Sequence, residues 1–180
     1  MICKRLFSSD GGEVQSVIRV SMIAAVDSRM GLSAQGRIPW DVPGDRAFFR
    51  SRTYGQSVLM GRRTFESLAG RVLEGRWCAV LSHRALEGAS RWPAGTLYSS
   101  PGLEAALEWC AARADIVYVS GGSEIYRLMM ARADELWLSR IEGDFGCDLF
   151  FPEIPGCFAL ELSEPRDGFM LEYWKNMSEA

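Results

Sequence analysis

Short apolar runs alternate with helical patterns along most of the chain. The first run, residues 17–26 (VIRVSMIAAV), is rich in β-branched side chains and shows little alternation, which is typical of a strand buried on both faces of a sheet. Later runs are predicted as strands at 57–60, 77–81, 96–98, 116–119 and 135–141. Helices are predicted over 44–53, 62–68, from Pro101 at the first helical position onward, and 123–131. This alternation favours an α/β domain built on a mostly parallel sheet.

The last part of the chain breaks this pattern. Residues 159–162 and 169–174 are predicted as an antiparallel pair, joined by a loop that holds Pro165 and Gly168. We therefore expect one domain over 17–180, with a mostly parallel central sheet, an antiparallel C-terminal hairpin and helices on both faces. Residues 1–16 are expected to form a flexible N-terminal extension.

Composition and charge narrow the class of protein. With 180 residues and 48% hydrophobic content, the chain is long enough for one domain with a real core. The formal net charge of −3 argues against nucleic acid as a partner, and no apolar run has the length of a membrane span. The five scattered cysteines form no CxxC and His83 is the only histidine, so neither a disulfide framework nor a metal site is expected. We expect a cytoplasmic monomer that binds small molecules.

A loop with two prolines precedes the first predicted helix. Residues 36–44 (GRIPWDVPG) cannot form a helix or an interior strand. Asp45 then lies in the first turn of the helix, and Phe48 and Phe49 follow three and four residues later on the same face. A carboxylate among aromatic rings is costly unless a cation or a hydrogen-bond donor meets it, so Asp45 is a candidate ligand-binding residue. The alternative is an acid favoured by the helix dipole, with the rings in the core.

Glycine-rich or polar segments directly follow three of the predicted strands. They are residues 61–64 (GRRT), 82–84 (SHR) and 121–123 (GGS). In open parallel sheets, ligands bind outside the carboxyl ends of the strands, where helix N-termini and guanidinium groups bind phosphate. The three segments together favour a phosphate-rich cofactor, whereas each one alone is more typical of a loop with solvated side chains. Neither GxGxxG after the first strand nor a P-loop is present, so a dinucleotide would be bound by a scheme other than the Rossmann one.

Five segments, in their order and spacing, resemble dihydrofolate reductase over almost the whole chain, from residue 18 to about 175. They are residues 22–25 (MIAA), 38–40 (IPW), 58–67 (VLMGRRTFES), 119–126 (VSGGSEIY) and 148–152 (DLFFP). Residues 119–126, 151–155 (FPEIP) and 172–174 (EYW) also resemble the mobile, trimethoprim-resistance branch of that family. The resemblance implies hydride transfer from NADPH to dihydrofolate, giving tetrahydrofolate, and antifolate inhibitors as further ligands.

The resemblance also implies which residues surround the pterin. Asp45 falls on the acidic active-site position, whose carboxylate pairs with the pterin and assists its protonation through water. Ser139 falls on the hydroxyl position that supports this acid, and Trp40 on the position that orders water near it. The implied substrate-binding residues are Ile23, Ala25, Asp45, Phe49, Arg71, Arg76 and Ser120. Among them, Arg76 pairs with the carboxylate of the glutamate tail, where a planar guanidinium gives bidentate geometry.

The cofactor side is implied in the same way. The cofactor-binding positions are Ala25, Met30, Gly31, Ile38, Gly61, Arg62, Arg63, Thr64, Leu81, Ser82, His83, Gly121, Gly122, Ser123, Glu124, Ile125 and Tyr126. Residues 27–40 are expected to close over the nicotinamide, and the family has a cis peptide bond at the glycine pair. For His83, a solvated loop residue is an equal alternative.

Some residues depart from the family pattern. Arg46 and Ser120 stand where apolar residues are usual, and Glu124 stands where a basic residue sometimes helps to bind the cofactor. Because Arg46 and Ser120 lie beside the expected position of a diaminopyrimidine ring, they predict weakened trimethoprim binding.

Three other interpretations are open at this point. The chain could be another NADPH-dependent reductase of the same fold, a nucleotide-binding domain without turnover, or a structural α/β domain. Arg76 favours folate, because a substrate without a glutamate tail leaves this arginine without a partner. The acid and the phosphate-side residues argue against a non-catalytic domain.

Overall fold

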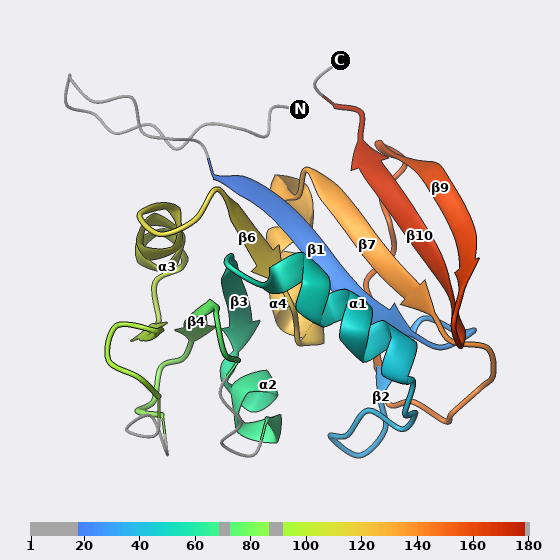
Figure 1. Ribbon diagram of the computed structural model, residues 1–180, viewed down its shortest axis with the longest axis horizontal. Coiled ribbons are helices and arrows are strands. Elements are labelled where there is room, and N and C mark those ends of the chain that lie inside the picture. The colour runs from blue at the N-terminus through green and yellow to red at the C-terminus, as the bar shows by residue number, and fades with distance from the viewer. Residues whose placement is uncertain (1–17, 69–72, 87–91, 179–180) are drawn as a thin grey trace.

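A computed structural model of the chain describes residues 18–68, 73–86 and 92–178. An eight-stranded sheet in the order β5-β4-β3-β6-β1-β7-β10-β9 lies at its centre (Figure 1). The strands are β1 (Arg19–Val26), β3 (Ser57–Gly61), β4 (Trp77–Leu81), β5 (Leu97–Ser100), β6 (Ile116–Val119), β7 (Glu135–Arg140), β9 (Phe158–Arg166) and β10 (Phe169–Asn176). The pairs from β5 through β7 are parallel, and β10 pairs antiparallel with β7 and β9. The predicted α/β fold with its antiparallel C-terminal pair is therefore confirmed.

Helices cover both faces of this sheet. They are α1 (Pro43–Thr53), α2 (Arg62–Ser67), α3 (Leu103–Ala111) and α4 (Ser123–Met129), the last continued by the 3-10 turn η2 (Met130–Arg132). Helix α1 crosses the near face of the sheet in Figure 1, and α4 lies behind it. No helix in the described ranges is long and apolar enough to cross a membrane.

Alternate side chains of a strand pack into different apolar clusters on the two faces of the sheet. Leu136 and Leu138 of β7 join the cluster that includes buried residues of α3 and α4. Trp137, between them, packs instead with Phe48 of α1. Because successive strand residues point to opposite faces, residues 135, 137 and 139 of β7 lie on the side that α1 covers.

Three local features differ from the sequence prediction. No strand is predicted over residues 27–36, but this segment contains β2 (Gly31–Ser33), which pairs antiparallel with β8 (Leu149–Phe150). Pro165 lies inside β9, opposite Met170, rather than in the connecting loop. Proline is tolerated there because β9 is the last strand of the sheet, so its missing N–H leaves no ladder bond unmade. Helix α3 begins at Leu103 after the N-cap Gly102, so Pro101 precedes the helix.

Candidate active site

Helix α1 places Asp45 over β7. The helix begins at Pro43 and carries an acid in its first turn and Arg50 and Arg52 in its last, an arrangement that the helix dipole favours. The carboxyl of Asp45 is half-buried and accepts a hydrogen bond from the buried hydroxyl of Ser139. Burial raises the pKa of Asp45 above its ordinary value, and the bond from Ser139 offsets only part of the rise. Within the described ranges no cation pairs with this carboxyl.

Three of the residues predicted to contact a substrate come from β1 and from the end of β6. Ala25 of β1 is half-buried and lies in register with Ser139 of the neighbouring strand. Ile23, two residues earlier, is buried, and its carbonyl accepts a hydrogen bond of 2.8 Å from the Tyr126 hydroxyl. Ser120 is half-buried, and its backbone N–H donates to the Leu59 carbonyl. These positions therefore converge at the carboxyl ends of β1, β6 and β7.

Arg76 lies at the other end of α1. It is only 7% exposed, with Nε 3.0 Å from Thr53 Oγ1 and Nη1 2.9 Å from the Glu74 carbonyl. Its guanidinium lies 6.0 Å from the ring centroid of Phe49. Burial, and then the charge of Arg50, lower the pKa of Arg76. Two neighbouring cations of this kind favour an anionic ligand. Arg71, another of the implied substrate-binding residues, lies outside the described residues.

Trp40 lies in the loop before α1. Its ring packs edge-on against the ring of Phe145, with 5.3 Å between the ring centroids, and belongs to the same apolar cluster as Phe48. The indole Nε1 is buried without a hydrogen-bond partner in the described part of the chain. Buried polar atoms of this kind are usually satisfied by ordered water, so the geometry fits the predicted role in holding a water molecule.

Asp27, which sequence reasoning did not single out, organises the segment that precedes Trp40. Its buried carboxyl accepts bonds from Gly31 N at 2.7 Å, Arg29 N at 2.9 Å and Phe145 N at 3.3 Å. Burial raises the pKa of Asp27, but these backbone bonds outweigh it and hold the pKa below its ordinary value. An aspartate at the start of a tight turn is a recognisable signal, but its bond to a residue more than a hundred positions away is not.

The same segment carries Met30, Gly31 and Ile38 from the predicted cofactor set. The carbonyl of Met30 accepts a bond from Phe151 N, and its sulfur lies 3.0 Å from Arg140 Nη1. A Cβ on Gly31 would lie 2.5 Å from Cys147 Cβ, so only glycine fits there. Ile38 is 65% exposed and projects from the loop.

The predicted cofactor loops adjoin one another at the ends of β3 and β6. Gly61 N donates to the Gly121 carbonyl at 2.8 Å, and the Gly121-Gly122 peptide bond is cis. A Cβ on Gly61 would lie 3.0 Å from Ile125 Cγ1, so this glycine allows the close approach of the two loops. Gly121 itself has φ +103, a conformation that favours glycine, and a Cβ there would lie 3.1 Å from Tyr126 Cε2.

Other predicted cofactor residues divide into two groups. The hydroxyls of three of them are engaged within the protein: Ser82 with the backbone of Arg84, Ser123 with the Phe150 carbonyl, and Tyr126 with the Ile23 carbonyl. The remaining side chains lie nearer the surface: Arg62, Arg63, Thr64, Leu81, His83, Glu124 and Ile125. Arg62 forms an ion pair of 2.6 Å with Glu66, one turn further along α2.

The described residues contain no group of three His, Cys, Asp or Glu side chains that could hold a metal. For NADPH, the glycine-lined approach of two strand ends and the arginines beside it fit a ligand with phosphate groups. Helices α2 and α4, which begin there, have no side-chain cap, so no side chain competes for their first N–H groups.

Comparison with known proteins identifies relatives of the chain. The family model "Dihydrofolate reductase" matches residues 19–166. A dihydrofolate reductase of Neisseria meningitidis is 35% identical over 138 residues, covering 77% of this chain and 82% of that protein. Dihydrofolate reductase type 15 of Escherichia coli is 34% identical over 142 residues, covering 78% of this chain and 86% of that protein.

A solved structure shares the fold. The dihydrofolate reductase of Enterococcus faecalis, complexed with NADP(H) and RAB-propyl, has a TM-score of 0.75 and 24% identity. The match covers 87% of this chain and 95% of the Enterococcus faecalis chain.

Proposed function

The chain belongs to the dihydrofolate reductase family, and on this basis we propose that it reduces 7,8-dihydrofolate to 5,6,7,8-tetrahydrofolate with NADPH. The observation that carries the proposal is Asp45, a half-buried carboxyl with a raised pKa and no cation beside it in the described structure. Such a group needs a donor-rich or cationic ligand to stabilise its charged form. A pterin, which presents a ring N–H and an amino group on one edge, meets that need.

The residues around Asp45 have distinct tasks in this proposal. Asp45 binds the pterin edge and favours the protonated ring, while Ser139 orients the carboxyl. Trp40 holds a water at its unpartnered Nε1, through which a proton reaches the ring. When bound, NADPH supplies the hydride, and residues at the ends of β3, β4 and β6 hold it. The protein thus contributes placement, proton supply and exclusion of bulk water.

Arg76 selects for the glutamate tail of the substrate. Its Nε and Nη1 atoms are held by Thr53 and Glu74, which fixes the plane of the guanidinium for a carboxylate. Phe49 follows Asp45 by about one turn of α1, and its ring centroid lies 6.0 Å from the Arg76 guanidinium. It is thus placed to pack against the part of the substrate that joins pterin and tail.

The test is the absorbance of the reduced nicotinamide, followed with dihydrofolate present and absent. We expect the protein to oxidise NADPH only when dihydrofolate is present, and tetrahydrofolate to accumulate in an amount equal to the NADPH consumed. Stable NADPH in the presence of dihydrofolate, or equal oxidation without it, would overturn the proposal.

We also propose that trimethoprim binds weakly. Arg46, directly after the acid, is paired with Asp41 in the preceding loop, and Ser120 offers little apolar surface where an aliphatic residue is usual. Restoring that surface with Ser120→Ile should lower the inhibition constant about tenfold, as expected for burying a few methylene groups. Inhibition of the unmodified protein at nanomolar trimethoprim would contradict this.

We further propose a cytoplasmic monomer with only small-molecule partners. In the described ranges Cys78, Cys110, Cys147 and Cys157 carry free thiols, which is in keeping with a reducing compartment. Size-exclusion chromatography with light scattering checks the monomer, and a mass of twice 20.1 kDa would contradict it.

A further inference from the structure

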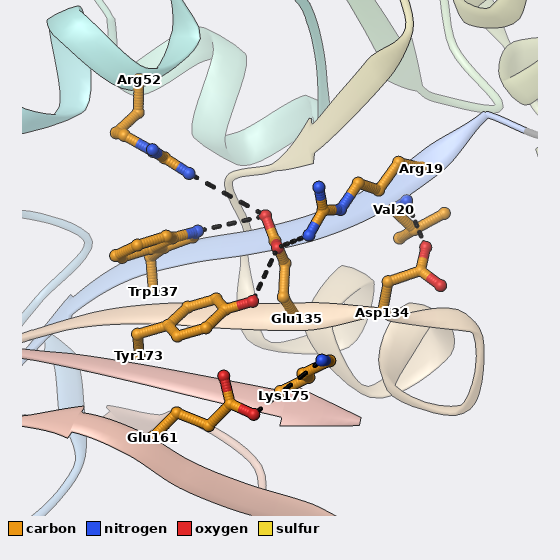
Figure 2. A network of polar contacts seen from close by, with 9 residues as sticks. All are labelled: Arg19, Val20, Arg52, Asp134, Glu135, Trp137, Glu161, Tyr173 and Lys175. Carbon is orange, nitrogen blue, oxygen red and sulfur yellow. Dashed lines mark hydrogen bonds and ion pairs between the residues drawn. The ribbon is translucent and has the colours of Figure 1, made fainter. Parts of the chain in front are cut away.

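A buried carboxylate lies at the opposite end of β7 from Ser139. Glu135, the first residue of β7, is 2% exposed. It forms an ion pair with Arg19 of β1 and accepts hydrogen bonds of 3.2 Å from Trp137 Nε1 and 3.2 Å from the Tyr173 hydroxyl (Figure 2). The mechanism above uses none of these groups. A buried charge with this many partners is costly to disturb, so it fixes the positions of the elements that supply them.

Helix α1 joins this network through Arg52. The Nη2 atom of Arg52 lies 4.0 Å from Glu135 Oε1, and its guanidinium stacks 4.0 Å from the centroid of the Trp137 ring. Arg52 also interacts with the hydroxyl of Tyr118 on β6. Figure 2 shows Arg52 reaching down from the helix toward the carboxylate, with Trp137 beneath it.

Helix α1 therefore contacts β7 at three successive places. Asp45 meets Ser139, Phe48 meets Trp137, and Arg52 meets Trp137 and Glu135. Residues 45, 48 and 52 share one helical face, and residues 139, 137 and 135 share one face of the strand. The helix covers about 10 Å between Asp45 and Arg52, and the strand about 13 Å between Ser139 and Glu135. The contacts thus fix both the rotation of α1 and its position along β7.

We propose that Arg52, held by Glu135 and Trp137, is a positioning residue that sets where α1 presents Asp45 and Phe49 to the substrate. This inference rests on the proposed reduction of dihydrofolate. The contact at the functional end is a single hydrogen bond from Ser139, made to a carboxyl that must also bind the ligand. A second attachment, an ion pair together with a ring stack, lies seven residues further along α1, and the proposed reaction does not use it. A displacement of about 1 Å at a reacting group can cost up to ~10²-fold in rate, so this attachment has a catalytic consequence.

Arg19 provides a matched control. It pairs with the same carboxylate as Arg52, but it comes from β1 rather than from α1. Arg19→Met and Arg52→Met each remove one positive charge and one partner of Glu135, and the methionine keeps an apolar stem. A role in stability alone predicts the same outcome for both variants, whereas a role in positioning predicts an effect on the site for Arg52→Met only.

The experiment measures kcat, the KM for dihydrofolate, NADPH affinity, the pH profile of kcat/KM and thermal stability for both variants. For Arg52→Met we expect a rise of about tenfold in KM with unchanged NADPH affinity. Its pH profile should move to lower pH, because a displaced Asp45 loses the burial that raises its pKa. Arg19→Met should lose thermal stability with KM and pH profile unchanged. An unchanged KM and profile in Arg52→Met, or equal changes in both variants, would overturn the proposal.

A second variant excludes a direct contact between Arg52 and the substrate. If Arg52 acts through Glu135, Glu135→Gln alone should raise KM, and the double variant should show little further change. Additive effects would contradict the proposal. Turnover by the unmodified protein is measured first, so absence of turnover counts against the proposed function. The pKa of the Asp45 carboxyl, followed by NMR in Arg52→Met, then still tests the positioning role.

Discussion

At the scale of single residues, Asp45 and Asp27 are two carboxyls with opposite electrostatic settings. Burial dominates at Asp45 and raises its pKa, whereas three backbone N–H groups outweigh burial at Asp27 and lower its pKa. A carboxyl with few hydrogen-bond partners can bind a ligand, whereas a carboxyl whose hydrogen bonds are all made within the protein stabilises the fold. The two residues therefore predict different consequences when each is replaced by the isosteric amide.

Asp45→Asn should abolish most of the activity. Because the amide can neither pair with a protonated pterin nor favour its formation, we expect kcat/KM to fall ~10²-fold or more, with NADPH affinity nearly unchanged. Stopped-flow measurement of NADPH oxidation checks this. Asp41→Asn is the matched control, because Asp41 is an exposed carboxylate in the loop just before α1, where it pairs with Arg46. Near-normal turnover in Asp45→Asn would remove Asp45 from its assigned role.

The same substitution should stabilise the protein without ligand at neutral pH. Since the folded pKa of Asp45 is raised, folding binds protons between the unfolded and folded pKa values, and stability falls as the pH rises through that window. Asp45→Asn should therefore melt at a higher temperature at pH 7, and the difference should vanish below about pH 4, where the unfolded carboxyl is also neutral. Calorimetry at several pH values checks this, and equal melting temperatures at pH 7 would count against the raised pKa.

Sequence reasoning could reach some of these residues and not others. Asp45, Phe48 and Phe49 lie within one helical turn, so their spacing alone places them on one face. Glu135 gives no such signal, because an acid at the start of a strand is normally solvated. It is buried only because Arg19 and Arg52 reach it from β1 and α1, and pairings between distant segments cannot be seen in a single sequence.

At the scale of elements, the segment between β1 and α1 is tied to the segment after β7. Asp27 accepts bonds from both segments, and β2 pairs with β8. Asp148 adds a further tie, donating its backbone N–H to the Ser33 carbonyl and accepting from Gln35 N at 2.8 Å. These ties hold the loop that is expected to cover the nicotinamide, so loosening them should affect loop closure.

Asp27→Asn should loosen this loop. The amide accepts the three backbone bonds less strongly than the carboxylate does, so we expect a loss of about 1–3 kcal/mol in unfolding free energy at pH 7. Because the folded pKa of Asp27 is lowered, this loss should disappear as the pH falls through that pKa. Hydrogen exchange at Gly31 and Phe145, with urea unfolding, measures both effects. Asp144→Asn, at an exposed ion pair with Arg29, is the control and should leave the unfolding free energy nearly unchanged. Unchanged exchange at both amides in Asp27→Asn would contradict the assignment.

The elements themselves were largely predictable from the sequence. The bounds of β4 and β6 agree with the prediction because both are buried apolar runs with clear ends. The strands β2 and β8 have three and two residues and no periodicity, so only their pairing defines them. The sequence pattern predicts a loop at Pro165 because proline usually ends a strand. The structure accepts this proline because β9 is the edge of the sheet, which is a property of the topology.

At the scale of the whole molecule, the predicted cofactor side and the predicted substrate side lie next to each other at one edge of the sheet. The carboxyl ends of β3, β4 and β6 form the predicted cofactor side, and those of β1 and β7, covered by α1, form the predicted substrate side. Hydride transfer needs both ligands side by side. Because adjacent parallel strands end at the same edge of the sheet, ligands that bind at these ends lie next to each other. Binding at these strand ends should therefore stabilise the entire fold.

NADPH should raise the melting temperature of the protein in the absence of substrate. At a free concentration 100 times its Kd, a ligand that binds only the folded state stabilises it by about 2.7 kcal/mol, or roughly 5–10 °C for a domain of this size. We expect a smaller shift from NADH, which lacks the 2′-phosphate that the predicted cofactor arginines would bind. Thermal unfolding with each nucleotide measures this, and equal shifts would contradict the predicted phosphate contacts.

The central claim is that Asp45 anchors the pterin beside the reduced nicotinamide. A crystal structure with folate and NADP⁺ bound tests it most directly. We predict the pterin ring N–H and amino group within hydrogen-bond distance of the Asp45 carboxylate, the tail carboxylate on Arg76, and α1 in the position fixed by Arg52. A pterin bound elsewhere, or Asp45 turned toward bulk solvent with folate in the site, would contradict the account.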